Sequence, residues 1–152
     1  MTNSIESVRM LIGRTCLALD AENYGEFLNG CTEEFTYRVT TFSPELGKDM
    51  VWLEHNREGY EGLIKMLPKH IRLKGRFNRQ AIVCDVVPQG DNHATVTSQL
   101  TVIHTNPEGE SRVLLAGRYI DQIVVGASGP ALAAREVNLD TRVLGPGIHT
   151  PI

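Results

Sequence analysis

Histidines are the first residues to consider for chemistry, because imidazole exchanges protons near neutral pH and also binds metals. The chain has His55, His70, His93, His104 and His149. No two of them share a spacing typical of a metal site, such as H-x-H or H-E-x-x-H, and the three cysteines form no C-x-x-C pair. The sequence therefore predicts no local metal site. An iron site of two histidines and one carboxylate, built from distant residues, stays open as an alternative.

A second group of polar residues falls on predicted strands, where side chains alternate between the two faces of a sheet. Tyr37, Asp85, His104 and Tyr119 share this alternation with apolar neighbours, and Asp121 lies two residues beyond Tyr119. In an apolar pocket such a carboxylate or phenol has a shifted pKa and can take part in proton transfer. These residues are therefore the pocket candidates for an isomerase, a dehydratase or a small-ligand binder. The structural alternative is that they satisfy local hydrogen bonds.

Charged residues interrupt the apolar strands near the end of the chain. Arg118, Asp121, Asp140 and Arg142 are the ones that stand out. A charge removed from water costs on the order of several kcal/mol unless it is paired and hydrogen-bonded. We therefore expect these four residues to form buried pairs or to contact a partner chain, since the guanidinium fork of arginine suits both. A sheet with one solvated face would accommodate the same charges without a partner.

Apolar residues at helical spacing predict three helices in the first seventy residues, at about 5–19, 20–31 and 56–67. The third should stop at Pro68, which lacks the backbone N–H that a continuing helix needs. Between the second and third helices, the alternating pattern changes to that of two short strands joined by a turn that contains Pro44 and Gly47.

Four β-rich runs follow at about 79–88, 93–105, 111–125 and 131–144. Their separators are short and rich in Gly, Asn, Asp or Pro, which is typical of hairpins and too short for a parallel crossover. Long antiparallel strands twist and curl. We predict one α+β domain over residues 1–152, with a curved, long-stranded mixed or antiparallel sheet that forms a cone closed by about three helices of the N-terminal half. An extended tail should follow at about 145–152.

Composition limits the function classes. The chain has 152 residues, 15 Lys+Arg, 18 Asp+Glu, a net charge of −3 and 41% hydrophobic residues. It has no basic face for nucleic acid or an anionic membrane, no apolar run long enough to span a bilayer and no signal-peptide layout. An odd number of cysteines indicates reduced thiols, so we expect Cys16, Cys31 and Cys84 to be buried small apolar residues of a cytoplasmic protein.

Several short motifs follow one another in a distinctive order. They are Tyr37-Arg38-Val39, Trp52-Leu53-Glu54-His55, Leu67-Pro68, Ala116-Gly117-Arg118-Tyr119-Ile120-Asp121 and Leu139-Asp140-Thr141-Arg142-Val143-Leu144. Their order and spacing, across essentially the whole chain, resemble the small (β) subunit of Rieske-type ring-hydroxylating oxygenases. The resemblance implies the cystatin-like cone that ketosteroid isomerase, scytalone dehydratase and nuclear transport factor two share.

The resemblance also implies a role. The chain would be a structural, non-catalytic subunit without cofactors that trimerises and joins catalytic large (α) subunits in a three-plus-three hexamer. The large subunit would carry a Rieske [2Fe–2S] cluster and a mononuclear Fe(II), take electrons from NADH through a separate reductase, and hydroxylate an aromatic or other small organic substrate. In agreement, no cysteine here has a histidine two or three residues later, as Rieske ligands require.

The alternative is a stand-alone cone-fold isomerase, dehydratase or small-ligand binder. Ketosteroid isomerases place a tyrosine on the first helix, where this chain has Ile5, Val8, Leu11 and Ile12. The histidine pair of the dehydratases has no counterpart either. These departures favour the subunit interpretation.

Overall fold

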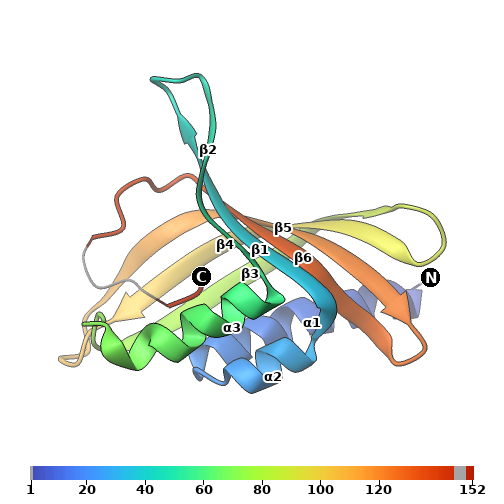
Figure 1. Cartoon of the computed structure of the whole chain (residues 1–152), viewed down its shortest axis with the longest axis horizontal. Helices are drawn as coiled ribbons and strands as arrows, with labels where there is room; N and C mark the ends of the chain where they lie inside the picture. The colour runs from blue at the N-terminus through green and yellow to red at the C-terminus, as the bar shows by residue number, and fades with distance from the viewer. Residues whose placement is uncertain (1, 146–149) are drawn as a thin grey trace.

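The computed structural model describes residues 2–145 and 150–152. Within them, six strands form one sheet in the order β2-β1-β6-β5-β4-β3. The helices lie together on the concave side of this curved sheet (Figure 1). The predicted α+β class and the cone-like arrangement are therefore confirmed, with a sheet that stays open because its edge strands β2 and β3 do not pair with each other.

The helices are α1 (Thr2–Asp20), α2 (Tyr24–Asn29) and α3 (Arg57–Met66), followed by a short 3-10 turn, η1 (Leu67–Lys69). Asn56 caps α3, since its side chain accepts a hydrogen bond from the Gly59 N–H at 2.8 Å. The second helix begins later than predicted. Its cap is Asn23, which accepts from the Glu26 N–H at 3.2 Å, whereas Asp20 is still the last residue of α1.

The strands are β1 (Cys31–Ser43), β2 (Lys48–Asn56), β3 (Arg76–Pro88), β4 (His93–Thr105), β5 (Ser111–Gly126) and β6 (Gly129–Leu139). The last four form the predicted antiparallel meander. The first strand pairs antiparallel with β2 and parallel with β6, which makes the sheet mixed. The last strand ends at Leu139 rather than near 144, because the backbone N–H groups of Asp140 and Thr141 both turn to the carbonyl of Ala116.

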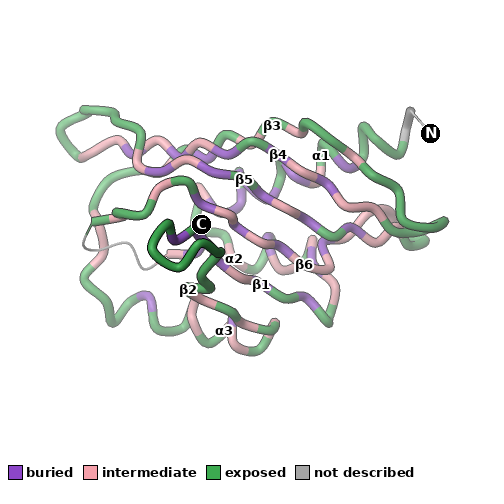
Figure 2. Tube along the Cα trace, turned by 90° about the horizontal axis from the view of Figure 1, so that it is seen from above, coloured by how far each residue is buried: buried purple, intermediate pink, exposed green. Residues whose placement is uncertain are grey.

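Buried and exposed positions alternate along the central strands, as Figure 2 shows. On β4 the inward side chains include Val96, Leu100 and Val102, and they face the apolar stripe of α1 that contains Ile12 and Leu19. The concave face of the sheet is therefore closed by packed side chains. Burial of this apolar surface is the main stabilising contribution to the fold.

Two expectations need correction or limitation. Cys16 and Cys31 are buried as predicted, but Cys84 is exposed on β3. A register shift between Val83 and Asp85 interrupts the ladder there, so Cys84 has no partner residue on β4. The predicted tail falls partly on residues 146–149, which lie outside the described residues.

Candidate functional site

Among the described residues, one ion pair in the interior of the cone is completely buried on both sides. Register places Asp121 on β5 opposite Arg135 on β6. The Arg135 Nε donates to Asp121 Oδ1 at 2.8 Å and its Nη2 donates to Oδ2 at 2.9 Å, with both side chains fully buried. The same Nη2 reaches Thr15 Oγ1 on α1 at 3.2 Å, and the guanidinium carbon lies 3.7 Å from the centre of the Tyr119 ring. The pair therefore joins the sheet to α1.

Each group of this pair stabilises the charged form of the other. Burial by itself disfavours a charged Arg135, but the Asp121 carboxylate outweighs burial and raises the pKa of Arg135. Burial raises the pKa of Asp121, and the neighbouring guanidinium works in the opposite direction. We regard both groups as charged because the two short hydrogen bonds need a carboxylate. With both oxygens of Asp121 bonded to Arg135, the carboxylate is poorly placed to act as a general base.

Aromatic side chains fill the space beside the ion pair. Tyr60 on α3 stacks on Phe27 with ring centres 5.4 Å apart and meets Phe35 and Tyr37 edge-on at 5.6 and 5.1 Å. Burial raises the pKa of Tyr37 to about 12 and raises the pKa values of Tyr60 and Tyr119 as well. These phenols therefore stay protonated at neutral pH and act as structural groups or as hydrogen-bond donors.

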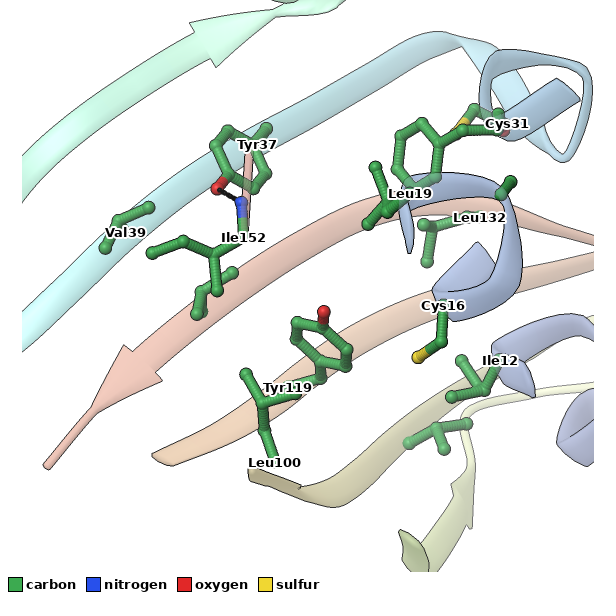
Figure 3. Close-up of a cluster of buried hydrophobic side chains, with 14 of the residues drawn as sticks. Ile12, Cys16, Leu19, Cys31, Tyr37, Val39, Leu100, Tyr119, Leu132 and Ile152 are labelled. Carbon is green, nitrogen blue, oxygen red and sulfur yellow. Dashed lines mark hydrogen bonds between the residues drawn. The ribbon is translucent and has the colours of Figure 1, made fainter. Parts of the chain in front are cut away.

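The end of the described chain enters the same interior. Ile152 is part of the core, and its backbone N–H donates to the Tyr37 hydroxyl oxygen at 3.0 Å. Figure 3 shows Ile152 between Tyr37 on one side and Tyr119 on the other. The Arg79 Nη2 donates to the carbonyl oxygen of Pro151 at 2.7 Å. A small void lined by Pro151, Ile152 and Phe77 has a volume of about 10 Å³.

The pocket candidates from the sequence do not form one acid–base set. Tyr37 and Tyr119 do point into the interior, but Asp85 is exposed on β3, so its prediction as a pocket residue is wrong. The register shift after Val83 accounts for this orientation. His104 is buried near the end of β4, with its Nε2 2.7 Å from the carbonyl oxygen of Lys74 in the loop before β3. The stand-alone enzyme interpretation therefore lacks the convergent groups that it needs.

The charged candidates divide into two classes. Asp121 is in a buried pair, with Arg135 as the partner that the candidate set did not include. Arg118 and Asp140 lie 3.7 Å apart with side chains 49% and 66% exposed, so as a buried pair within this chain they are a wrong prediction. Arg142 likewise is half-exposed and lies 3.7 Å from Glu45. Their alternative role in contacts with a partner chain stays a prediction.

Exposed apolar side chains gather on the hairpin of β1 and β2, which projects beyond the rest of the sheet (Figure 1). Those with at least about four-tenths of their surface exposed are Phe42, Leu46, Met50, Val51 and Trp52. We call these five residues the hairpin patch. Apolar groups of this size on a projecting hairpin are typical of a contact surface.

Charges border the hairpin patch. Hydrogen bonds from its own backbone and from the Ser43 hydroxyl lower the pKa of Glu45 at the hairpin turn, so this carboxylate is charged next to Arg142. Asp140 and Arg142 follow directly on β6. An apolar centre with a charged rim is the usual composition of a protein–protein interface.

A separate groove of about 840 Å³ lies between the end of α1, η1 and the loop after it. Arg72 and Glu22, both of which line it, form an ion pair of 2.7 Å. The other charged side chains that line it, among them Lys74 and Arg76, are mostly basic. Its lining contains none of the four pocket candidates, and it shares Phe77 and Thr150 with the small void beside Pro151 and Ile152.

Metal ligands do not cluster in the structure. Across residues 2–145 and 150–152, no group of three or more His, Cys, Asp or Glu side chains is arranged to hold a metal ion. In the same part of the chain, no helix is both long and apolar enough to cross a membrane.

Comparison with known proteins adds an independent line of evidence. Residues 1–129 match the model of the SnoaL-like domain. The β subunit of 2-aminobenzenesulfonate 2,3-dioxygenase from Alcaligenes sp is 34% identical over 88% of this chain and 89% of its own length. The chain belongs to the SnoaL-like domain family and to the family of oxygenase β subunits.

Two further comparisons agree with this membership. The hydroxylase β subunit of methanesulfonate monooxygenase from Methylosulfonomonas methylovora is 31% identical to this SnoaL-like chain over 99% of it and 88% of its own length. A crystal structure described as the β subunit of an aromatic-ring-hydroxylating dioxygenase from Novosphingobium aromaticivorans has the same fold. Its TM-score is 0.82 at 17% identity, over 97% of this chain and 95% of that one. The resemblance seen in the sequence is therefore confirmed.

Proposed function

We propose that this chain is the structural, non-catalytic small subunit of a multicomponent oxygenase and that it holds catalytic large subunits in position. The observation that carries the proposal is the match to two oxygenase β subunits at 31–34% identity along nearly the full length of both proteins. The interior supports it, because Ile152 and the aromatic cluster occupy the space where a stand-alone cone enzyme needs an open pocket.

The redox chemistry then belongs to the partner. A large subunit with a Rieske [2Fe–2S] cluster and a mononuclear Fe(II), supplied with electrons from NADH by a reductase, would perform the hydroxylation. This chain offers neither the soft-ligand pairs of a Rieske cluster nor an assembled group of metal ligands among its described residues. The complex would work in the cytoplasm, where the free thiols of Cys16 and Cys31 stay reduced.

The hairpin patch and its charged rim form the proposed contact with the large subunit. Tryptophan and large apolar side chains carry much of the binding energy in protein interfaces, and rim charges set orientation. Trp52 and Leu46 provide the large apolar side chains. The charges of the rim come from Arg118, Asp140 and Arg142. Asp121 takes no part, since it is fully buried against Arg135.

Self-association of three small subunits with three large ones is the proposed stoichiometry. The substrate of the complex would be an aromatic or other small organic molecule. Both similar β subunits belong to enzymes named for sulfonates, 2-aminobenzenesulfonate and methanesulfonate. Small organic sulfonates are therefore the first substrates to test.

The test is co-purification. The tagged chain is expressed with an oxygenase large subunit from the same genome, and iron, colour and mass of the captured complex are measured. We expect the chain alone to be colourless and inactive, and the complex to be brown, with equal numbers of the two subunits. Turnover of an organic substrate by the isolated chain, or failure to capture any large subunit from that genome, would overturn the proposal and favour the stand-alone enzyme.

A further inference from the structure

Two buried arginines in this chain, Arg135 and Arg79, both donate hydrogen bonds from the same edge of the guanidinium group. The Nε and Nη2 atoms of an arginine form one edge with two parallel N–H donors, which fits the two oxygens of a carboxylate. Arg135 uses this edge fully, with Nε on one oxygen of Asp121 and Nη2 on the other. Arg79 has the same edge but a different partner.

Arg79 lies near the start of β3, and only 6% of its surface is exposed. Its Nη1 donates to Asp20 Oδ1 at 2.8 Å, so one side of the guanidinium is occupied by α1. On the other edge, Nη2 donates to the carbonyl oxygen of Pro151 at 2.7 Å. The Nε beside it is buried and has no hydrogen-bond partner, as is true of eight side-chain N or O atoms in the described part of the chain. A peptide carbonyl has one oxygen and satisfies half of this edge.

The rest of the surroundings are suited to a compact apolar group. The Arg79 guanidinium lies 5.8 Å from the centre of the Phe77 ring, and Val102 and Leu115 line the remaining small void with it. Ile152 fills the adjoining space, and its N–H is held by the Tyr37 hydroxyl at 3.0 Å (Figure 3). We call the space now held by Pro151 and Ile152, with Arg79 at its base, the tail seat.

We infer that the tail seat is a binding site for a small carboxylate with a compact apolar body, and that Pro151 and Ile152 occupy it as an internal competitor. The Nε and Nη2 of Arg79 would each donate to one oxygen of the carboxylate, where the tail offers a single acceptor oxygen. The apolar body of the ligand would replace the Ile152 side chain next to Tyr37 and Tyr119. The seat faces into the cone, on the other side of the sheet from the outward charges of the proposed subunit contact, so it is independent of any large subunit.

The charges around the tail seat determine its affinity for a carboxylate. Asp20 is the acidic group that faces Arg79, and it already neutralises the guanidinium from the opposite side. A bound carboxylate therefore gains mainly from the geometry of the two bonds, and its affinity should rise when the charge of Asp20 is removed. Asp20→Asn keeps an oxygen to accept the Arg79 backbone N–H, which Asp20 now holds at 3.1 and 3.2 Å.

Benzoate is a suitable probe because it combines two carboxylate oxygens with a compact ring. In the full-length chain carrying Pro151→Gly and Ile152→Gly, we expect saturable one-to-one binding of benzoate by calorimetry, at least about tenfold tighter than in the unmodified chain. Adding Arg79→Lys, which keeps the charge but loses the two-donor edge, should weaken binding at least about fivefold. Adding Asp20→Asn instead should strengthen it.

The matched control is Ile71→Gly, which removes the same side chain from a position that is 91% exposed and should leave benzoate binding as weak as in the unmodified chain. Circular dichroism establishes that each variant is folded; if the double variant is not, Ile152→Ala provides the same comparison with a smaller deletion. A folded tail variant that fails to bind benzoate, or that binds uncharged toluene equally well, would overturn the assignment.

Discussion

Asp121 and Arg135 lie opposite each other on β5 and β6, and two hydrogen bonds of 2.8 and 2.9 Å join their fully buried side chains. Through Thr15 the pair also reaches α1. A pair with this burial and geometry is costly to break on one side, because the remaining charge has no water to solvate it. The ion pair therefore has a structural role in the interior, away from the exposed residues of the proposed partner contact.

The first prediction concerns this pair. Asp121→Ala should lower the free energy of unfolding by about 3–5 kcal/mol, since it leaves the Arg135 guanidinium buried and uncompensated. Urea denaturation followed by circular dichroism measures the loss. Asp140→Ala is the matched control, because the Asp140 carboxylate is 66% exposed and its partner Arg118, 3.7 Å away, is 49% exposed. If the free energy of unfolding fell equally in the two variants, the buried pair would contribute no more to stability than the exposed one.

Alkaline pH should unfold the protein through its tyrosines. The pKa of Tyr37 is raised by burial from 10 to about 12, so the unfolded chain releases this proton about two pH units before the folded one. The stabilising contribution, about 3 kcal/mol, is complete below pH 10 and is lost as pH rises toward 12. Tyrosinate absorbance and circular dichroism should change together in this window.

Tyr37→Phe supplies the control for the alkaline transition. It removes the ionisable hydroxyl, and with it the acceptor of the Ile152 N–H, so it should be less stable at neutral pH yet lose less stability between pH 10 and 12. Non-cooperative titration of all four tyrosines near pH 10, with the fold intact, would contradict the buried environment described here.

The hairpin patch should bind the large subunit. Leu46→Asp and Trp52→Ala should each weaken capture of the large subunit at least about tenfold, because both side chains are exposed in the isolated chain and would be buried in the complex. The melting temperature of the isolated chain should hardly change. Val113→Asp, at a residue 65% exposed on β5, is the control. Undiminished capture by both hairpin variants, measured by pull-down with purified components, would place the contact elsewhere.

Two glycines should respond in opposite ways to alanine. A Cβ added at Gly117 on β5 would clash with the carbonyl oxygen of Asn138 on β6, so Gly117→Ala must push two central strands apart and should cost about 1–3 kcal/mol. At Gly62 on α3 the new methyl group meets nothing within 4 Å, so Gly62→Ala should stabilise the helix by about 0.5–1 kcal/mol. Thermal unfolding measures both changes: the melting temperature should fall for Gly117→Ala and rise for Gly62→Ala.

Thiol labelling should separate the three cysteines. Cys84 is exposed, whereas burial raises the pKa of Cys31 to about 12 and that of Cys16 above its usual value. A maleimide should therefore modify one thiol quickly in the folded protein and all three only in denaturant. Mass spectrometry of the labelled peptides identifies the site. Fast modification of Cys16 or Cys31 without denaturant would mean that the interior opens more readily than its packing indicates.

Much of the fold was predictable because its signals are local. The hairpins at Gln89–Asn92 and Asn106–Glu110 follow from short turns between long β-rich runs, and the bounds of β4 were predicted without error. The cap of α3 at Asn56 has an equally local cause. The parallel pairing of β1 with β6 has none, since it joins segments about a hundred residues apart.

The amino-acid sequence by itself determined the class of fold, the meander, the oxygenase β-subunit resemblance and the need to neutralise the charges on the last strands. Only the tertiary structure decided which charges are buried. From the β5–β6 turn, simple counting places Asp121 opposite Ala134, but the register shift between Gln122 and Ile123 adds one residue and brings Arg135 opposite instead. In the same way, nothing local shows that Pro151 and Ile152 return to Arg79, because that contact depends on the packing of distant segments.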